Sequence, residues 1–152
     1  MNYFLVFLLW TFVVYWMHRL AHVMPFLREY HSDHHAQVID RTIEGLNWKN
    51  MFLWFDSWKS TADQWFTEVF PTIIISAVFD QWWLFGFYYV WAAFIQEAIE
   101  HNEKINLYPF LTSGKWHLIH HDDPTKNYGV FFPIWDILFR TIDGNRKSLA
   151  SN

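Results

Sequence analysis

The sequence contains no cysteine, which excludes disulfide bonds, thiolate metal sites, iron–sulfur clusters and cysteine nucleophiles. It also lacks a basic surplus, since 11 Lys and Arg stand against 15 Asp and Glu for a formal net charge of −4. A nucleic-acid-binding protein is expected to have such a surplus, so we expect no nucleic acid among the partners. The 5 glycines are scattered and form no GxGxxG loop, so the chain does not bind a nicotinamide by that route.

Apolar and aromatic residues are abundant, at 53% and 22% of 152 residues, which excludes disorder and fits one domain. The first apolar run extends from Met1 to Met17. As a helix it measures roughly 26 Å, close to the ~30 Å thickness of a bilayer core. A signal peptide is disfavoured, because no Lys or Arg precedes the run and no small-residue cleavage site follows it. We expect the helix to continue through His22 and to stop before Pro25.

A second apolar block extends from about Trp65 to Ile99 and is too long for one span. It predicts a hairpin with helices at about 64–79 and 82–101 and a tight turn at 80–81, in which Pro71 kinks the outgoing helix. The expected fold is an all-α integral membrane bundle with about three transmembrane helices and a cytoplasmic His-rich helical cap. We expect one domain over 1–152, with its motifs between about 17 and 143.

The basic residues are placed asymmetrically. All 11 lie either between the first span and the hairpin or after the hairpin. The positive-inside rule makes that side cytoplasmic, so the C-terminus and all histidines are expected there. Two short aromatic segments, 48–55 and 128–139, are predicted to lie along the headgroup layer.

The 9 histidines fall into an H-x3-H pair, an H-x2-H-H triplet, a single residue and a second triplet. They are His18 and His22, then His31, His34 and His35, then His101, then His117, His120 and His121. Positions i, i+3 and i+4 share one face of a helix, so each triplet directs three imidazoles the same way. Neutral imidazole is a good ligand for iron, copper, nickel and zinc. The number of imidazoles exceeds the needs of one ion and predicts two.

Carboxylates near the histidines are candidate further ligands. The third span ends with Glu97-x3-His101, as the first ends with His18-x3-His22, so Glu97 takes the place of His18 in a pseudo-repeat. Glu97 is predicted to be a ligand or a hydrogen-bond acceptor for one; an exposed interfacial carboxylate is the alternative. The acids Asp33, Asp122 and Asp123 either orient imidazoles or are solvated.

These motifs resemble the fatty acid hydroxylase/sterol desaturase superfamily. The resemblance lies in HRLAH followed by HSDHH at 18–35, His101-Asn102, and HLIHH at 117–121 followed by NYGVFF and Trp135-Asp136. It implies an integral membrane enzyme with a cytoplasm-facing non-haem di-iron centre, ligated by all nine histidines. It further implies O2-dependent hydroxylation or desaturation of a lipid from the bilayer, such as a fatty acyl chain or a sterol.

Iron also fits the chemistry, because zinc cannot activate O2 and side chains alone supply no suitable oxidant. Two further electrons must come from outside, so we expect a separate donor: a reductase, a ferredoxin or a b-type cytochrome. The alternatives are a carotenoid hydroxylase of similar site chemistry, a zinc-dependent membrane hydrolase with Glu97 or Glu100 as general base, and a non-catalytic metal-binding or transport protein.

Overall fold

The computed structural model describes residues 2–36 and 47–143, and leaves the side chain of Glu97 undescribed. Helices make up its regular structure, and the β-pairing in the described residues is one isolated bridge between Asn106 and Gly114. The all-α prediction is therefore confirmed. The described chain divides into a first unit, 2–36 with 47–95, and a second unit, 96–143. The single domain expected over 1–152 stays a prediction.

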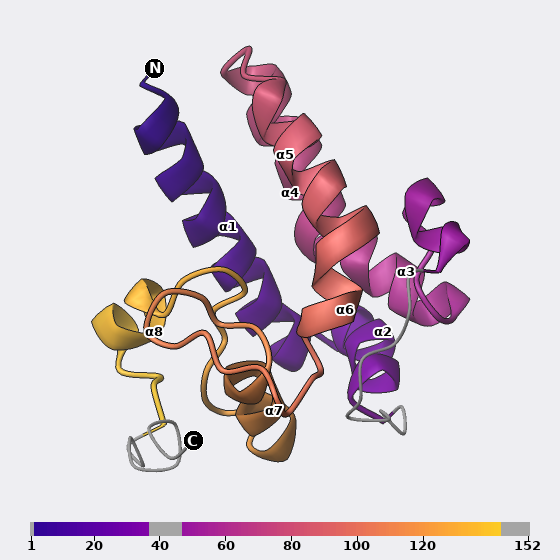
Figure 1. The fold of residues 1–152 in the computed structure, drawn as a ribbon, viewed down its shortest axis with the longest axis vertical. Coiled ribbons are helices and arrows are strands. Elements are labelled where there is room, and N and C mark those ends of the chain that lie inside the picture. The colour runs from indigo at the N-terminus through magenta and orange to yellow at the C-terminus, as the bar shows by residue number, and fades with distance from the viewer. Residues whose placement is uncertain (1, 37–46, 144–152) are drawn as a thin grey trace. The chain divides into compact units, whose positions relative to one another are not determined.

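The first helix, α1 (Tyr3–Val23), begins and ends at clear signals (Figure 1). The Asn2 side chain caps its start by accepting a hydrogen bond from the N–H of Phe4 at 2.9 Å. Met24 is extended, as expected for a residue that precedes a proline, and Pro25 opens α2 (Pro25–Ala36). The predicted stop before Pro25 is confirmed.

The outgoing arm of the hairpin is a helical rod that starts earlier than predicted and contains a π-helical turn. Its consecutive parts are α3 (Trp58–Gln64), η2 (Trp65–Val69) and α4 (Phe70–Val78). The N–H of Phe70 bonds to the carbonyl of Trp65, five residues back. Pro71 follows directly and has no N–H to donate. The helix thus widens next to the proline, where the sequence predicted a kink.

The return arm also contains a π-helical turn. It consists of α5 (Trp83–Trp91), η3 (Ala92–Gln96) and α6 (Glu97–Ile99). The tight turn before it uses Asp80 in a left-handed conformation, with φ of 50°. By length and composition, α1 is the one helix in the described part of the chain that passes as a membrane span. The two spans expected in the hairpin stay predictions.

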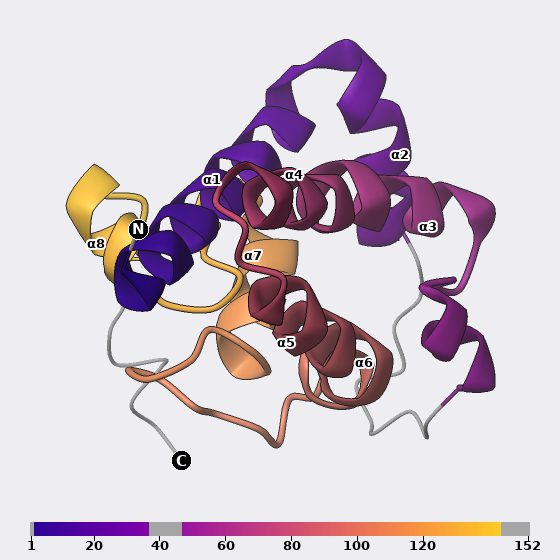
Figure 2. The ribbon, with the colours of Figure 1, turned by 90° about the horizontal axis from the view of Figure 1, so that it is seen from above.

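Within the first unit, α1 packs along α4, and α4 packs along α5 (Figures 1 and 2). The packed face of α1 includes Trp10, which is fully buried and donates its indole N–H to Thr72 Oγ1 at 2.7 Å. The start of α1 lies beside the hairpin turn, because the rings of Tyr3 and Trp83 are 5.9 Å apart. His18 lies on the same packed face, near the opposite end of α1.

The aromatic segment after residue 47 forms a short 3-10 helix, η1 (Trp48–Phe52). Trp48 and Phe52 are exposed, and an open groove of about 420 Å³ is lined by Trp48, Lys49, Phe52 and Trp54. Its placement along the headgroup layer stays a prediction. Three cations that entered the charge asymmetry, Arg41, Arg146 and Lys147, lie outside the described residues.

The second unit carries two short helices, α7 (Lys115–Asp122) and α8 (Ile134–Phe139). Gly114 precedes α7 with φ of 74°, and a Cβ atom there would collide with the backbone carbonyl of Ile105. The backbone needs a glycine at this position for both reasons. The helix that begins after Gly114 carries the second histidine triplet, as the spacing predicted.

Candidate metal centre

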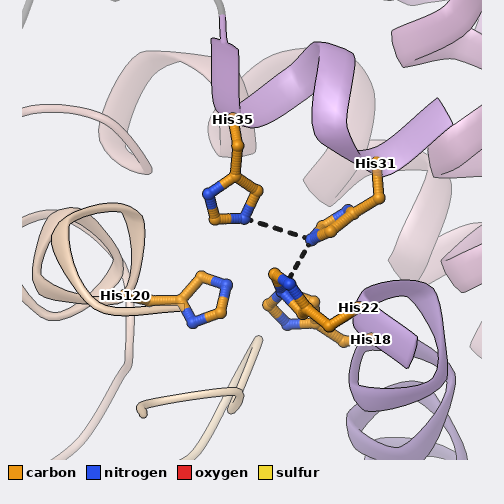
Figure 3. A group of neighbouring side chains, drawn as sticks. All are labelled: His18, His22, His31, His35 and His120. Atoms are coloured by element: carbon orange, nitrogen blue, oxygen red, sulfur yellow. Dashed lines mark hydrogen bonds between the residues drawn. The ribbon is translucent and has the colours of Figure 1, made fainter. Parts of the chain in front are cut away.

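Four histidines of the first unit converge, and we call them the first cluster: His18, His22, His31 and His35. Neighbouring turns of α1 supply the first two, and neighbouring turns of α2 supply the others. One ring nitrogen of each lies within 4.8 Å of the corresponding nitrogens of the other three. Figure 3 shows these rings pointing toward one another from the two helices.

His31 contacts two other members of the first cluster, and we call a histidine in this central position the hub. Its Nε2 atom lies 2.9 Å from Nε2 of His22 and 3.2 Å from Nε2 of His35. The residue is buried, at 5% exposure. Its other ring nitrogen, Nδ1, lies 2.9 Å from Oδ2 of Asp63 on α3. Sequence reasoning missed Asp63, because no motif or spacing links it to a histidine 32 residues earlier.

Three histidines of the second unit converge in the same way, and we call them the second cluster: His101, His117 and His121. His117 is the hub, with Nε2 3.1 Å from Nε2 of His101 and 3.0 Å from Nε2 of His121. Neutral imidazole is the form that binds metals.

A buried carboxylate also accompanies the second hub. Glu100 Oε1 lies 3.8 Å from Nδ1 of His117, and its Oε2 accepts a hydrogen bond from the side-chain amide of Gln96 at 3.1 Å. Glu100 and Gln96 are both buried, at 8% and 2% exposure. The sequence indicates Glu100 only as a general base of the alternative hydrolase. The side chain of Glu97, the carboxylate predicted to be a ligand, lies outside the described residues.

The middle histidines of the triplets are His34, on α2 of the first unit, and His120, on α7 of the second. The ring of His34 lies 5.8 Å from that of His31. His120 is fully buried, and its Nδ1 donates to the backbone carbonyl of Lys126 at 2.6 Å, because a carbonyl only accepts. Its lone pair is therefore on Nε2, the nitrogen that remains for a metal.

The loop that binds His120 depends on Asp136. This carboxylate is fully buried on α8 and accepts hydrogen bonds from the backbone N–H groups of Tyr128 and Gly129, each at 2.8 Å. It also accepts one from the Thr141 hydroxyl at 2.7 Å. The Asn-Tyr-Gly and Trp-Asp motifs are thus parts of one structure that fixes the segment after His120.

The remaining acids named from the sequence have other neighbours. Asp33 accepts a hydrogen bond from the Ser57 hydroxyl at 2.8 Å. Asp122 is exposed at the end of α7. Asp123 accepts hydrogen bonds from the side chain and backbone of Thr125, which lower the pKa of its carboxyl group. Their predicted role in orienting imidazoles stays a prediction.

The nitrogen spacings of both clusters fit a metal ion. Metal–nitrogen bonds to histidine are about 2.1 Å long, so two ligands at right angles on one ion stand about 3.0 Å apart. The four hub distances range from 2.9 to 3.2 Å. With neutral imidazoles as the donor set, each cluster suits a first-row transition metal.

Comparisons with known proteins identify the family of the chain. The chain is 28% identical over 128 residues to a Delta(7)-sterol 5(6)-desaturase, erg3A, of Aspergillus fumigatus. The match covers 84% of this chain and 33% of the relative, so the chain spans about a third of that protein's length. No solved structure matches. The family model for fatty acid hydroxylases matches residues 3–141, which include both clusters and the Asp136 loop. The chain therefore belongs to the fatty acid hydroxylase family.

Proposed function

We propose that this protein is a membrane-bound, O2-dependent non-haem iron enzyme that hydroxylates or desaturates a lipid. It binds two iron ions, one at each histidine cluster. His34 and His120 complete the set of nine ligands. When bound, iron supplies the O2-activating chemistry that protein side chains lack. The name of the sterol desaturase relative supports a lipid as the substrate.

The observation that carries the proposal is the convergence of Nε2 atoms on each hub. Two imidazole Nε2 atoms lie 2.9 and 3.2 Å from the hub atom, which is the spacing of ligands on one metal ion. The second cluster repeats the arrangement at 3.1 and 3.0 Å. Two sites of the same construction favour two ions over one.

The first unit supports a membrane topology. The start of α1 and the hairpin turn lie together, as the Tyr3–Trp83 contact shows, and His18 lies near the other end of α1. If α1, α4 and α5 cross the bilayer, the histidines of α1 lie at one face and the hairpin turn at the opposite face. By the positive-inside rule, the distribution of Lys and Arg supports a cytoplasmic location for the histidine face.

The proposed reaction requires an electron donor. Hydroxylation consumes O2, two electrons and two protons per C–H bond, and yields one alcohol and one water. Desaturation consumes the same reagents and yields an alkene and two waters. We infer that a separate reductase, ferredoxin or b-type cytochrome provides the electrons on the cytoplasmic side.

Lipid mass spectrometry of cells that express the chain tests the reaction. We expect a lipid that has gained one oxygen atom or lost two hydrogen atoms, and no such product from a His120→Ala control. Metal analysis of the purified protein should give two irons per chain. One zinc per chain with hydrolytic turnover would overturn the proposal in favour of a hydrolase. A hydroxylated carotenoid would assign the substrate to that class of lipid.

A further inference from the structure

The two hub histidines, His31 and His117, have equivalent surroundings. Each is the first histidine of its triplet, and each directs Nε2 at two other histidines and Nδ1 at a buried carboxylate. The neighbouring histidines also correspond, since in each cluster one precedes the triplet and one ends it: His22 and His35, and His101 and His121. The carboxylates come from different places in the sequence, so their shared position is a property of the fold.

Asp63 is the carboxylate of the first cluster. It is buried, at 7% exposure, and its backbone carbonyl accepts the Thr67 hydroxyl at 2.8 Å within the helical rod. A carboxylate accepts hydrogen bonds, so the 2.9 Å contact requires that Nδ1 of His31 carries the hydrogen. The lone pair of that ring is then on Nε2. Within the described residues no hydrogen bond reaches the other oxygen, Oδ1, so His31 is the partner of this carboxylate.

Glu100 is the carboxylate of the second cluster. At 3.8 Å its contact with Nδ1 of His117 is an ion-pair distance rather than a hydrogen bond. The amide of Gln96 fixes the direction of the carboxylate. The backbone carbonyl of Glu100 accepts a hydrogen bond from the N–H of Gly114 at 2.9 Å. This bond ties Glu100 to the start of the helix that carries His117.

We propose that Asp63 and Glu100 are the positioning residues of the two metal sites. Each carboxylate keeps the hydrogen of its hub histidine on Nδ1, so that Nε2 is free of hydrogen and faces the ion. Neither is a ligand. This inference rests on the proposed function, because it requires that the clusters bind metal. Carboxylates placed in this way fix the orientation of a ligating imidazole and raise its basicity, and their loss typically weakens metal binding about 10–100-fold.

Cobalt(II) titration of the full chain in detergent micelles tests the proposal, because visible absorption reports the ligands of the ion. Asp63→Ala should weaken binding at one site about 10–100-fold. Asp63→Asn should lose less, because its amide oxygen still accepts the Nδ1 hydrogen. The matched control, Glu29→Ala, removes an exposed carboxylate that lies 3.6 Å from the Lys59 ammonium, and should bind cobalt as the original chain does.

The second cluster has its own pair of variants. Glu100→Ala should weaken the other site, and Glu103→Ala, which removes an exposed carboxylate three residues away, should not. Nitrogen-15 NMR of histidine-labelled apoprotein gives a readout without metal. The Nδ1–H tautomer of His31 should dominate in the original chain and in Asp63→Asn. The asparagine variant therefore tests the proposal even if Asp63→Ala does not fold.

The outcomes separate this inference from the proposed function. Unchanged cobalt affinity in Asp63→Ala and Glu100→Ala, with affinity lost in His31→Ala and His117→Ala, would overturn the positioning role alone. An Nε2–H tautomer of His31 in the apoprotein would overturn it as well. Cobalt binding that survives both histidine substitutions would instead overturn the metal sites and, with them, the proposed function.

Discussion

The backbone N–H of Gly129 donates to Asp136 Oδ2 at 2.8 Å, and the same oxygen lies 2.7 Å from the position that a Cβ atom on residue 129 would take. The carbonyl of Phe132 lies equally close to that position. A side chain at residue 129 would therefore collide with the carboxylate that fixes its backbone.

Gly129→Ala is expected to lower the free energy of unfolding by about 1–3 kcal/mol, because the buried Asp136 has little room to move. Gly86→Ala is the matched control. Gly86 lies inside α5, and none of the described residues beyond its own helical turn comes within 4 Å of the position that a Cβ atom would take, so alanine there should stabilise by about 0.5–1 kcal/mol. Denaturant unfolding in micelles measures both. Equal stability of the two variants would contradict the prediction.

Asp136→Ala should cost about 3 kcal/mol or more, since it leaves buried donors of Tyr128, Gly129 and Thr141 without their acceptor. Asp136→Asn keeps one acceptor oxygen and should fall between alanine and the original residue. Because the same loop carries the carbonyl that binds His120, Asp136→Ala should also reduce the iron content. An alanine variant as stable as the asparagine variant would show that the carboxylate has no such role.

Thr72→Val should destabilise the packing of α1 on α4 by about 1–3 kcal/mol, because the buried indole N–H of Trp10 loses its acceptor. Thr72→Ser keeps the hydroxyl and should cost less. In a Trp10→Phe background the cost of Thr72→Val should shrink, which a double-mutant cycle measures. Additive effects would mean that the 2.7 Å contact does not couple the two helices.

His22→Ala and His101→Ala should each remove about half of the bound iron, because each takes a ligand from a different cluster. The double variant should retain almost none. Elemental analysis of protein purified with iron supplied in the growth medium gives the ratio. If either single variant lost both ions together, the two clusters would not bind them independently.

Iron-loaded protein supplied with lipid and O2 alone should give no multiple turnover. Each cycle consumes two electrons, and the described site residues cannot replace them. Addition of a reductase system should start turnover, and the lipid product can be counted per iron. Sustained turnover without reductant would refute the need for a separate donor.

Histidine spacing and one proline allowed much of this arrangement to be predicted. Pro25 ends α1 where the restriction on its preceding residue requires. The pseudo-repeat predicted that His22 and His101 occupy equivalent positions. In the structure each of them lies beside the first and last histidines of the triplet that follows it. Local rules were sufficient here, because ligands on one helix are separated by a fixed number of turns.

The carboxylates and the π-helical turns could not be predicted in the same way. Asp63 reaches His31 only because α3 packs on α2, and no local pattern specifies that contact. For Glu100, spacing favoured Glu97 because it lies a full turn before His101, whereas the chain after Ile99 leaves the helix and brings Glu100 to His117. A π-helical turn has no distinct hydrophobic period, so Pro71 was the one local sign of it.

Each hub histidine shares a short helix with the last member of its triplet, and α7 has only eight residues. An isolated helix of that length is unstable in water, so its winding depends on contacts made elsewhere. An ion that bridges two successive turns supplies such a contact, and part of its binding energy becomes folding energy. If the proposed ion binds there, the winding of α7 therefore depends in part on the metal.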